Sequence, residues 1–176
     1  MTHLVPRKPV PALEVPTVGG GAWSLAASKP ENFTMVVFYR GLHCPICSGY
    51  LRDLDRREGE FAERGVKTIV VSSDVEERAR RAKQEWGIEK TPVGYGLAID
   101  KAREWGLFVS SGHGKTSTGV EEPAQFNEPG LFLVRPDGTL YASSVNTMPF
   151  ARPNFGDLVK ALDVIIARNY PARGEA

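Results

Sequence analysis

The chain has 176 residues with 41% hydrophobic content, which is enough to bury one substantial core, so we predict a single domain over residues 1–176. Its 22 basic and 21 acidic residues leave a net charge of +1, which gives no electrostatic case for binding nucleic acid or an anionic membrane. The proline-rich residues 1–16 hold no apolar signal segment, and no window approaches the ~18 apolar residues of a membrane span. We therefore expect a cytoplasmic protein.

Apolar periodicity along the chain predicts strands and helices in alternation. β-Branched or continuously apolar segments indicate strands over residues 34–39, 66–72, 95–99, 130–134 and 139–143. Apolar side chains at helical spacing indicate helices over residues 45–64, 75–86, 100–107 and 155–166, the second of them capped by Ser73 or Asp74. A turn sequence over residues 135–138 joins the last two strands into an antiparallel hairpin. This order predicts an α/β fold with a mixed sheet and helices on both faces.

The only two cysteines of the chain, Cys44 and Cys47, lie three residues apart directly after the first buried strand. Two cysteines placed at random would show this spacing about one time in a hundred, so the pair favours chemistry over accident. Pro45 suits a first helical turn, and a helix N-terminus lowers a cysteine pKa from about 8.5 toward about 7. We predict that Cys44 is an exposed attacking thiolate and that Cys47 closes an intramolecular disulfide with it.

Two other interpretations of the cysteine pair are weaker. The cysteines could be inert core residues, although a position between a strand and a helix argues against this. They could be half of a zinc site, but structural zinc takes four ligands and the chain adds only His3, His43 and His113. We therefore expect neither a metal nor a cofactor.

Arg40 and His43 are candidate cations beside the nucleophile. His43 could stabilise a thiolate as an imidazolium, or be an exposed residue without a role. Arg40 is the better candidate because it is always charged and lies near the end of the strand, although it could instead only pair with a surface carboxylate.

The segment Tyr39-Arg40-Gly41-Leu42-His43-Cys44-Pro45-Ile46-Cys47 resembles the peroxiredoxin-like (AhpC/TSA, redoxin) family of the thioredoxin fold, in its members with a Tyr-Arg-Gly-x-x-Cys-Pro-x-Cys motif. The resemblance spans nearly the whole chain, and residues 20–25 are similar to the N-terminal hairpin of that family. It implies a thioredoxin-like mixed sheet with an N-terminal hairpin extension. It also implies that a cysteine thiolate reduces a peroxide or a disulfide with electrons from thioredoxin, glutathione or a similar donor, and we allow for a homodimer.

The chain departs from the peroxidatic motif of that family, Pro-x-x-x-Thr/Ser-x-x-Cys. When the motif is aligned on Cys47, Arg40 and Cys44 take the proline and hydroxyl positions, and aligned on Cys44 these positions fall on Val37 and Gly41. Neither alignment completes the motif.

A second departure concerns an arginine that the family places before a Gly-Leu-Phe strand, where this chain has Pro129. A proline there resembles the cis-proline that faces the dithiol in thioredoxin-like reductases, although Pro129 could simply open a strand. On the first interpretation disulfide reduction should outpace peroxide reduction. Arg152 matches a position that is often arginine in the family, and we interpret it as structural. Glu128 would oppose activation of Cys44 if it faced that thiol.

Residues 109–127 are polar and glycine-rich, and loops longer than about 12–15 residues are usually functional or disordered. The glycines in this stretch do not have the spacing of a phosphate-binding loop. Two functions remain open. The first is a thiol-dependent peroxidase or disulfide reductase that uses Cys44 and Cys47. The second is a non-enzymatic redox sensor or scaffold whose dithiol switches this loop or a dimer surface.

Overall fold

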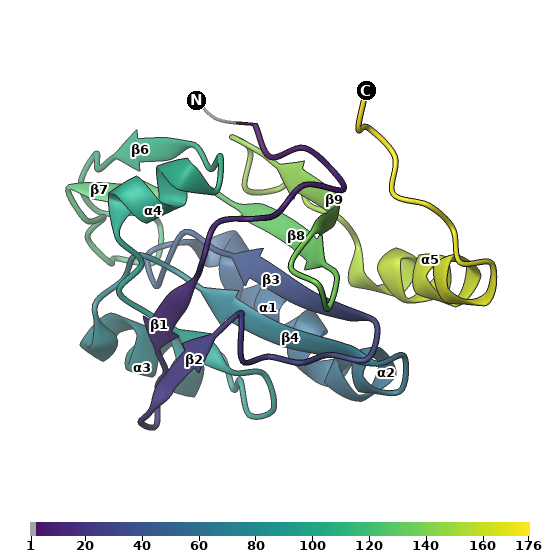
Figure 1. The fold of residues 1–176 in the computed structure, drawn as a ribbon. Helices are drawn as coiled ribbons and strands as arrows, with labels where there is room; N and C mark the ends of the chain where they lie inside the picture. The colour runs from purple at the N-terminus through teal and green to yellow at the C-terminus, as the bar shows by residue number, and fades with distance from the viewer. Residues whose placement is uncertain (1–2) are drawn as a thin grey trace.

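The computed structural model describes residues 3–176, and Figure 1 shows strands and helices alternating along most of the chain. Its strands are β1 Glu14–Pro16, β2 Ala22–Ser24, β3 Phe33–Phe38, β4 Val66–Val71, β5 Val93–Gly94, β6 Val109–Ser111, β7 Gln125–Asn127, β8 Gly130–Val134 and β9 Leu140–Val145. Its helices are α1 Pro45–Arg56, α2 Glu58–Ala62, α3 Glu76–Glu85, α4 Ile99–Glu104 and α5 Phe155–Ala167. None of these helices is long and apolar enough to cross a membrane.

The central sheet has five strands in the order β5-β4-β3-β8-β9. β3 runs parallel to β4 and antiparallel to β8, and β8 pairs antiparallel with β9. The expected mixed sheet and its closing hairpin are therefore confirmed. In the register of β3, Phe38 lies beside Val71 of β4 and Gly130 of β8. The loops after β3 and β4 and the segment before β8 consequently meet at one edge of the sheet.

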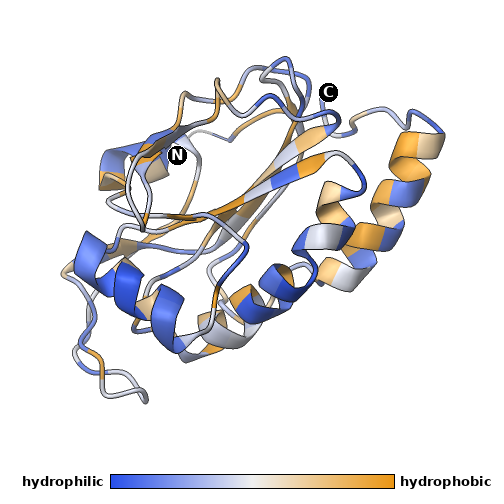
Figure 2. Cartoon of the chain, turned by 90° about the horizontal axis from the view of Figure 1, so that it is seen from below, coloured by the Kyte–Doolittle hydropathy of each residue, from blue (hydrophilic) through white to orange (hydrophobic). Residues whose placement is uncertain are grey.

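The side chains of β3 alternate between two apolar layers, as the pleat of a strand requires. Met35 and Val37 face a core cluster that includes side chains of α1, α2, α3 and α5. Val36 and Phe38 face a second cluster, which includes Ala102 of α4 and Trp105 directly after that helix. Figure 2 shows the apolar strands between these layers, with the hydrophilic sides of the helices turned outward. Helices on both faces agree with the predicted α/β fold.

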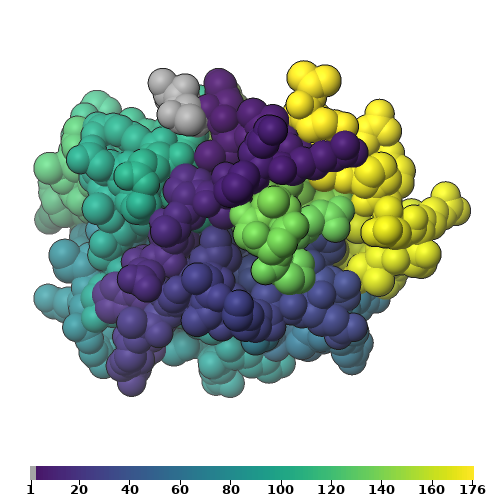
Figure 3. All heavy atoms as spheres, in the orientation of Figure 1, coloured from purple at the N-terminus to yellow at the C-terminus, as the bar shows by residue number. Residues whose placement is uncertain are grey.

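The N-terminal segment crosses the surface and lies beside the C-terminal segment (Figure 3). β1 and β2 form an antiparallel pair, which confirms the N-terminal hairpin. Ahead of it, the backbone N–H of Arg7 donates to the carbonyl of Leu140 in β9 at 2.8 Å. The Arg7 guanidinium donates to the carbonyl of Ala172 at 3.0 Å, which joins the N-terminal and C-terminal segments.

Three local expectations are wrong. The helix expected over residues 45–64 is divided at Arg57 into α1 and α2. The strand expected over residues 95–99 is replaced by the two-residue strand β5, because Gly96 adopts a positive φ of 69° and turns the chain out of the sheet. Neither Ser73 nor Asp74 caps α3, whose N-cap residue is Val75, because the Asp74 carboxylate binds the loop after β3 instead.

The glycine-rich stretch over residues 109–127 is an ordered hairpin. β6 and β7 pair antiparallel at its base, and a further bridge joins Lys115 to Glu121 near its tip. The hydroxyl of Thr116 donates to the carbonyl of His43 at 2.7 Å. The tip of this hairpin therefore lies against the residue that precedes Cys44.

Candidate active site

The two cysteines occupy the start of α1, as predicted. Cys44 is the N-cap residue, Pro45 is the first residue of the helix, and Cys47 follows in its first turn. Both thiols are unpaired, so the pair is in its reduced form. The prediction that Cys44 is exposed is wrong, since only 1% of Cys44 and none of Cys47 is accessible to solvent.

Arg152, in the loop between β9 and α5, contacts both sulfurs. Its Nη2 lies 3.0 Å from Sγ of Cys47 and 3.7 Å from Sγ of Cys44. The guanidinium also stacks over the ring of Tyr50, 5.0 Å from its centroid. Arg152 is therefore part of the candidate site, in direct contact with the dithiol. Arg152 lies 105 positions from Cys47 in the sequence. Its only indication in the sequence was the match to a position that is often arginine in the peroxiredoxin-like family.

The local charges favour a thiolate on Cys44. The thiol of Cys47 donates a hydrogen bond to Cys44, and this bond is the largest cause of a Cys44 pKa lowered to about 6. Burial opposes the shift, while Arg152, the backbone N–H of Cys47 and Arg40 support it. Burial raises the pKa of Cys47 well above its ordinary value, and the neighbouring Cys44 raises it further. Although Arg152 lies nearer to Cys47, the opposite directions of the two pKa shifts favour Cys44 as the thiolate and Cys47 as the thiol.

His43 does not supply a positive charge. It is fully buried against Phe126, with ring centroids 4.5 Å apart, and burial is the main cause of a pKa lowered to about 4. Its Nδ1 lies 3.3 Å from Nη2 of Arg78. A guanidinium can only donate, so Nδ1 accepts and the neutral ring carries its proton on Nε2. His43 is therefore neither a charged imidazolium nor an exposed residue, so both interpretations from the sequence are wrong.

Arg40 is half-buried and faces two carboxylates. Its Nε lies 3.2 Å from Glu128 and its Nη2 lies 3.7 Å from Glu122. The hydroxyl of Ser110 donates to the other oxygen of Glu128 at 2.5 Å. These contacts occupy the Glu128 carboxylate, so it is not free to oppose ionisation of Cys44. Arg40 supports the thiolate, but less strongly than Arg152 does.

Pro129 lies near the site, but its peptide bond is not the cis bond that was expected. None of the peptide bonds in residues 3–176 is cis, so the cis-proline interpretation is wrong. Pro129 instead lines a cavity of about 10 Å³ together with Tyr50, Asn146 and Arg152. The guanidinium that the sequence lacks at position 129 is thus supplied beside it by Arg152.

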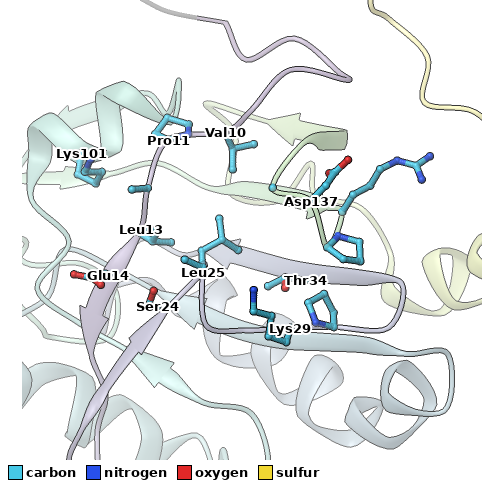
Figure 4. A pocket seen from close by; sticks show the side chains of 16 residues that line it. Val10, Pro11, Leu13, Glu14, Ser24, Leu25, Lys29, Thr34, Lys101 and Asp137 are labelled. Atoms are coloured by element: carbon cyan, nitrogen blue, oxygen red, sulfur yellow. The ribbon is translucent and has the colours of Figure 1, made fainter.

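A wider pocket of about 610 Å³ lies near the opposite end of β3, where Thr34 lines it with the N-terminal segment and the β8–β9 turn. Figure 4 shows its mixed lining, which includes Leu13, Lys29 and Asp137 and neither cysteine. No group of three or more His, Cys, Asp or Glu side chains within residues 3–176 is arranged to hold a metal ion.

A five-stranded mixed sheet with a dithiol at a helix N-terminus defines a thiol oxidoreductase of the thioredoxin fold. The profile of the AhpC/TSA family matches residues 6–143, and the chain belongs to this family. It is a thiol-dependent antioxidant oxidoreductase. No curated protein sequence matches the chain.

Solved structures share the fold at low sequence identity. Peroxidoxin BcpB from Mycobacterium tuberculosis is 16% identical with a TM-score of 0.71, over 93% of this chain and 99% of that one. AhpC from the same organism is 13% identical with a TM-score of 0.75, over 97% and 98% of the two chains. AhpC from Enterococcus faecalis is 16% identical with a TM-score of 0.72, over 98% and 99%. The predicted fold class is confirmed.

Proposed function

We propose that Cys44 is the nucleophile that reduces a small hydroperoxide and that Cys47 then resolves the product as an intramolecular disulfide. The observation that carries this assignment is the shared contact of Arg152 with both sulfurs, in a site where Cys47 donates its proton toward Cys44. The guanidinium stabilises the thiolate before the reaction and faces the charge that develops on oxygen during it.

The first step oxidises Cys44. Its thiolate attacks one oxygen of the hydroperoxide, so that a sulfur–oxygen bond forms while the oxygen–oxygen bond breaks. The departing alkoxide or hydroxide takes up a proton from solvent water, and Cys44 becomes a sulfenic acid. The Cys47 sulfur then attacks Cys44, the sulfur–sulfur bond replaces the sulfur–oxygen bond, and hydroxide leaves with the Cys47 proton as water.

The cycle closes when a thiol donor reduces the disulfide by thiol–disulfide exchange, in which one dithiol molecule or two monothiol molecules deliver two electrons and two protons. Thioredoxin, glutathione or a similar donor fits this step, and a reducing compartment such as the cytoplasm would supply it. Disulfide reduction is not proposed to be faster than peroxide reduction, because that expectation depended on a cis Pro129 and on the lack of a nearby guanidinium.

The test is the mass of the reduced protein before and after one equivalent of hydrogen peroxide. The unmodified chain should lose about 2 Da as both thiols form a disulfide, whereas Cys47→Ser should gain about 16 Da as a sulfenic acid. Cys44→Ser should not react at a comparable rate. If Cys47→Ser instead abolishes the first step and Cys44→Ser keeps it, Cys47 is the nucleophile and the assignment is reversed.

A further inference from the structure

Asp74 places a fully buried carboxylate at the sheet edge that carries the dithiol. Its Oδ2 accepts a 2.7 Å hydrogen bond from the backbone N–H of Leu42, and its Oδ1 accepts one of 2.8 Å from Nε of Arg78. β3 and β4 are neighbouring parallel strands, so the loop with Cys44 and the loop with Asp74 lie side by side. A buried carboxylate is stable only while such bonds are kept, so it constrains the backbone that it binds.

Gly41 shows how closely the cysteine loop follows this carboxylate. A Cβ atom at Gly41 would lie 2.6 Å from Oδ2 of Asp74, and the residue has a φ of +128°, which side chains rarely adopt. The carbonyl of Gly41 in turn accepts the backbone N–H of Cys44 at 3.1 Å. One short path of contacts thus leads from the carboxylate to the nucleophile.

Arg78 extends this path to the β6–β7 hairpin. Besides Asp74, its guanidinium donates to the carbonyl of Glu121 at 3.1 Å and to Nδ1 of His43 at 3.3 Å. Thr116 of the same hairpin donates to the carbonyl of His43. The residue directly before Cys44 is therefore held through its ring and through its backbone.

We propose that Asp74 and Arg78 are positioning residues, which hold residues 41–43 so that the Cys44 sulfur stays at the start of α1 and beside Arg152. Neither acts on the sulfur directly, since Asp74 works through the N–H of Leu42 and Arg78 works through His43. This inference rests on the proposed role of Cys44 as the nucleophile.

Positioning and simple charge predict opposite effects for Asp74. If the carboxylate acted only as a nearby negative charge, its removal would favour the thiolate and lower the Cys44 pKa. If it positions the loop, its removal displaces Cys44 from the groups that lower that pKa, which are the Cys47 thiol, Arg152 and Arg40. The Cys44 pKa should then rise.

The experiment measures the pH dependence of iodoacetamide alkylation at Cys44, and peptide mass identifies the labelled cysteine. The variants are Asp74→Ala, Asp74→Asn and Gly41→Ala, the last of which leaves the net charge unchanged. We expect the alkylation midpoint to rise by about one pH unit in Asp74→Ala, toward the ~8.5 of a free thiol, and by less in Asp74→Asn, which keeps an acceptor for Leu42. The rate constant with hydrogen peroxide should fall by about tenfold to a hundredfold in Asp74→Ala. Gly41→Ala should raise the midpoint as well, because its Cβ displaces the loop from the other side.

Asp55→Ala is the matched control. Asp55 is also a buried carboxylate, and it accepts backbone N–H groups of Glu89, Lys90 and Thr91, none of which belongs to the cysteine loop. Its loss should lower the thermal midpoint and leave the alkylation midpoint of Cys44 unchanged. An unchanged or lowered alkylation midpoint in the Asp74 variants would overturn the positioning role, and Asp74→Asn decides this if Asp74→Ala does not fold. Labelling that appears first on Cys47 in the unmodified chain would overturn the proposed nucleophile instead.

Discussion

Replacing Arg152 by alanine should remove a substantial part of the activation of Cys44, while the hydrogen bond from Cys47 remains. The guanidinium lies 3.7 Å from Sγ of Cys44, where the attraction between unit charges is about 4–5 kcal/mol at an effective dielectric constant of ~20. Desolvation offsets much of this attraction, and hydrogen bonds to charged groups contribute about 1.5–3 kcal/mol net, or about one to two pKa units. The Cys44 pKa should therefore rise from about 6 to about 7–8.

The same substitution should slow the reaction with hydrogen peroxide. Loss of one charged donor to a developing oxyanion commonly costs about 10²–10³ in rate, and the smaller thiolate fraction adds to this at neutral pH. The pH profile of alkylation separates the two effects, because the residual loss at pH 9 reports only on the transition state. Arg152→Lys keeps a positive charge and should fall between alanine and the unmodified chain.

Arg135→Ala is the control for lost stacking. Arg135 lies 5.0 Å from the ring centroid of Tyr141, the same separation as between Arg152 and Tyr50, but it is in the turn between β8 and β9. Its removal should leave the alkylation midpoint and the peroxide rate constant unchanged. A folded Arg152→Ala protein with the same two values as the unmodified chain would refute the role of Arg152.

Three further outcomes are expected. The free energy of unfolding should decrease by at most about 3 kcal/mol as the pH falls from 6.5 toward 4. The reason is that His43 binds a proton in the unfolded chain, whereas the buried ring, with a pKa of about 4, stays neutral. Urea titrations should show a flatter dependence on pH for His43→Gln. Asn154→Ala should destabilise the protein by about 1 kcal/mol, since the Asn154 side chain caps α5 by accepting the N–H of Asp157 at 3.1 Å; an unchanged urea midpoint would contradict this. Gly130→Ala should cost about 1–3 kcal/mol because its Cβ would meet Leu107 at 2.4 Å, whereas Gly59→Ala, with open space, should not lower the thermal midpoint.

The sequence was sufficient for the features that depend on neighbouring residues. The spacing of Cys44 and Cys47 with Pro45 between them located the dithiol at a helix start, and the continuous apolar run before it located β3. The turn over residues 135–138 predicted the hairpin of β8 and β9 in the same way. In each case the local pattern and the final fold favour the same structure, so short-range reasoning succeeds.

The features that the sequence did not reveal depend on contacts between distant segments. Arg152 reaches the sulfurs only because the loop before α5 folds back over α1, and the same contact buries Cys44, which local reasoning placed at the surface. The carboxylate of Asp74 could cap α3 but binds the N–H of Leu42, 32 residues away. Burial against Phe126 also removes the positive charge expected of His43, and a long-range packing partner of this kind leaves no periodic signal in the sequence.

Because the dithiol is buried beneath Arg152, the two halves of the proposed catalytic cycle differ in the size of the molecule that has to reach the sulfurs. A hydroperoxide is small enough to approach a sulfur through a slight movement of side chains, whereas a protein or glutathione thiol must align with both sulfurs and needs the covering loop displaced. In the reduced protein the attraction of the guanidinium for the thiolate adds to the stacking of Arg152 on Tyr50 in holding that loop, and within residues 3–176 no group accepts from Nε or Nη1 of Arg152. Disulfide formation removes that negative charge. On the proposed cycle, we therefore expect the bond that completes oxidation to weaken this cover and to ease the approach of a bulky donor at the stage when there is a disulfide to reduce.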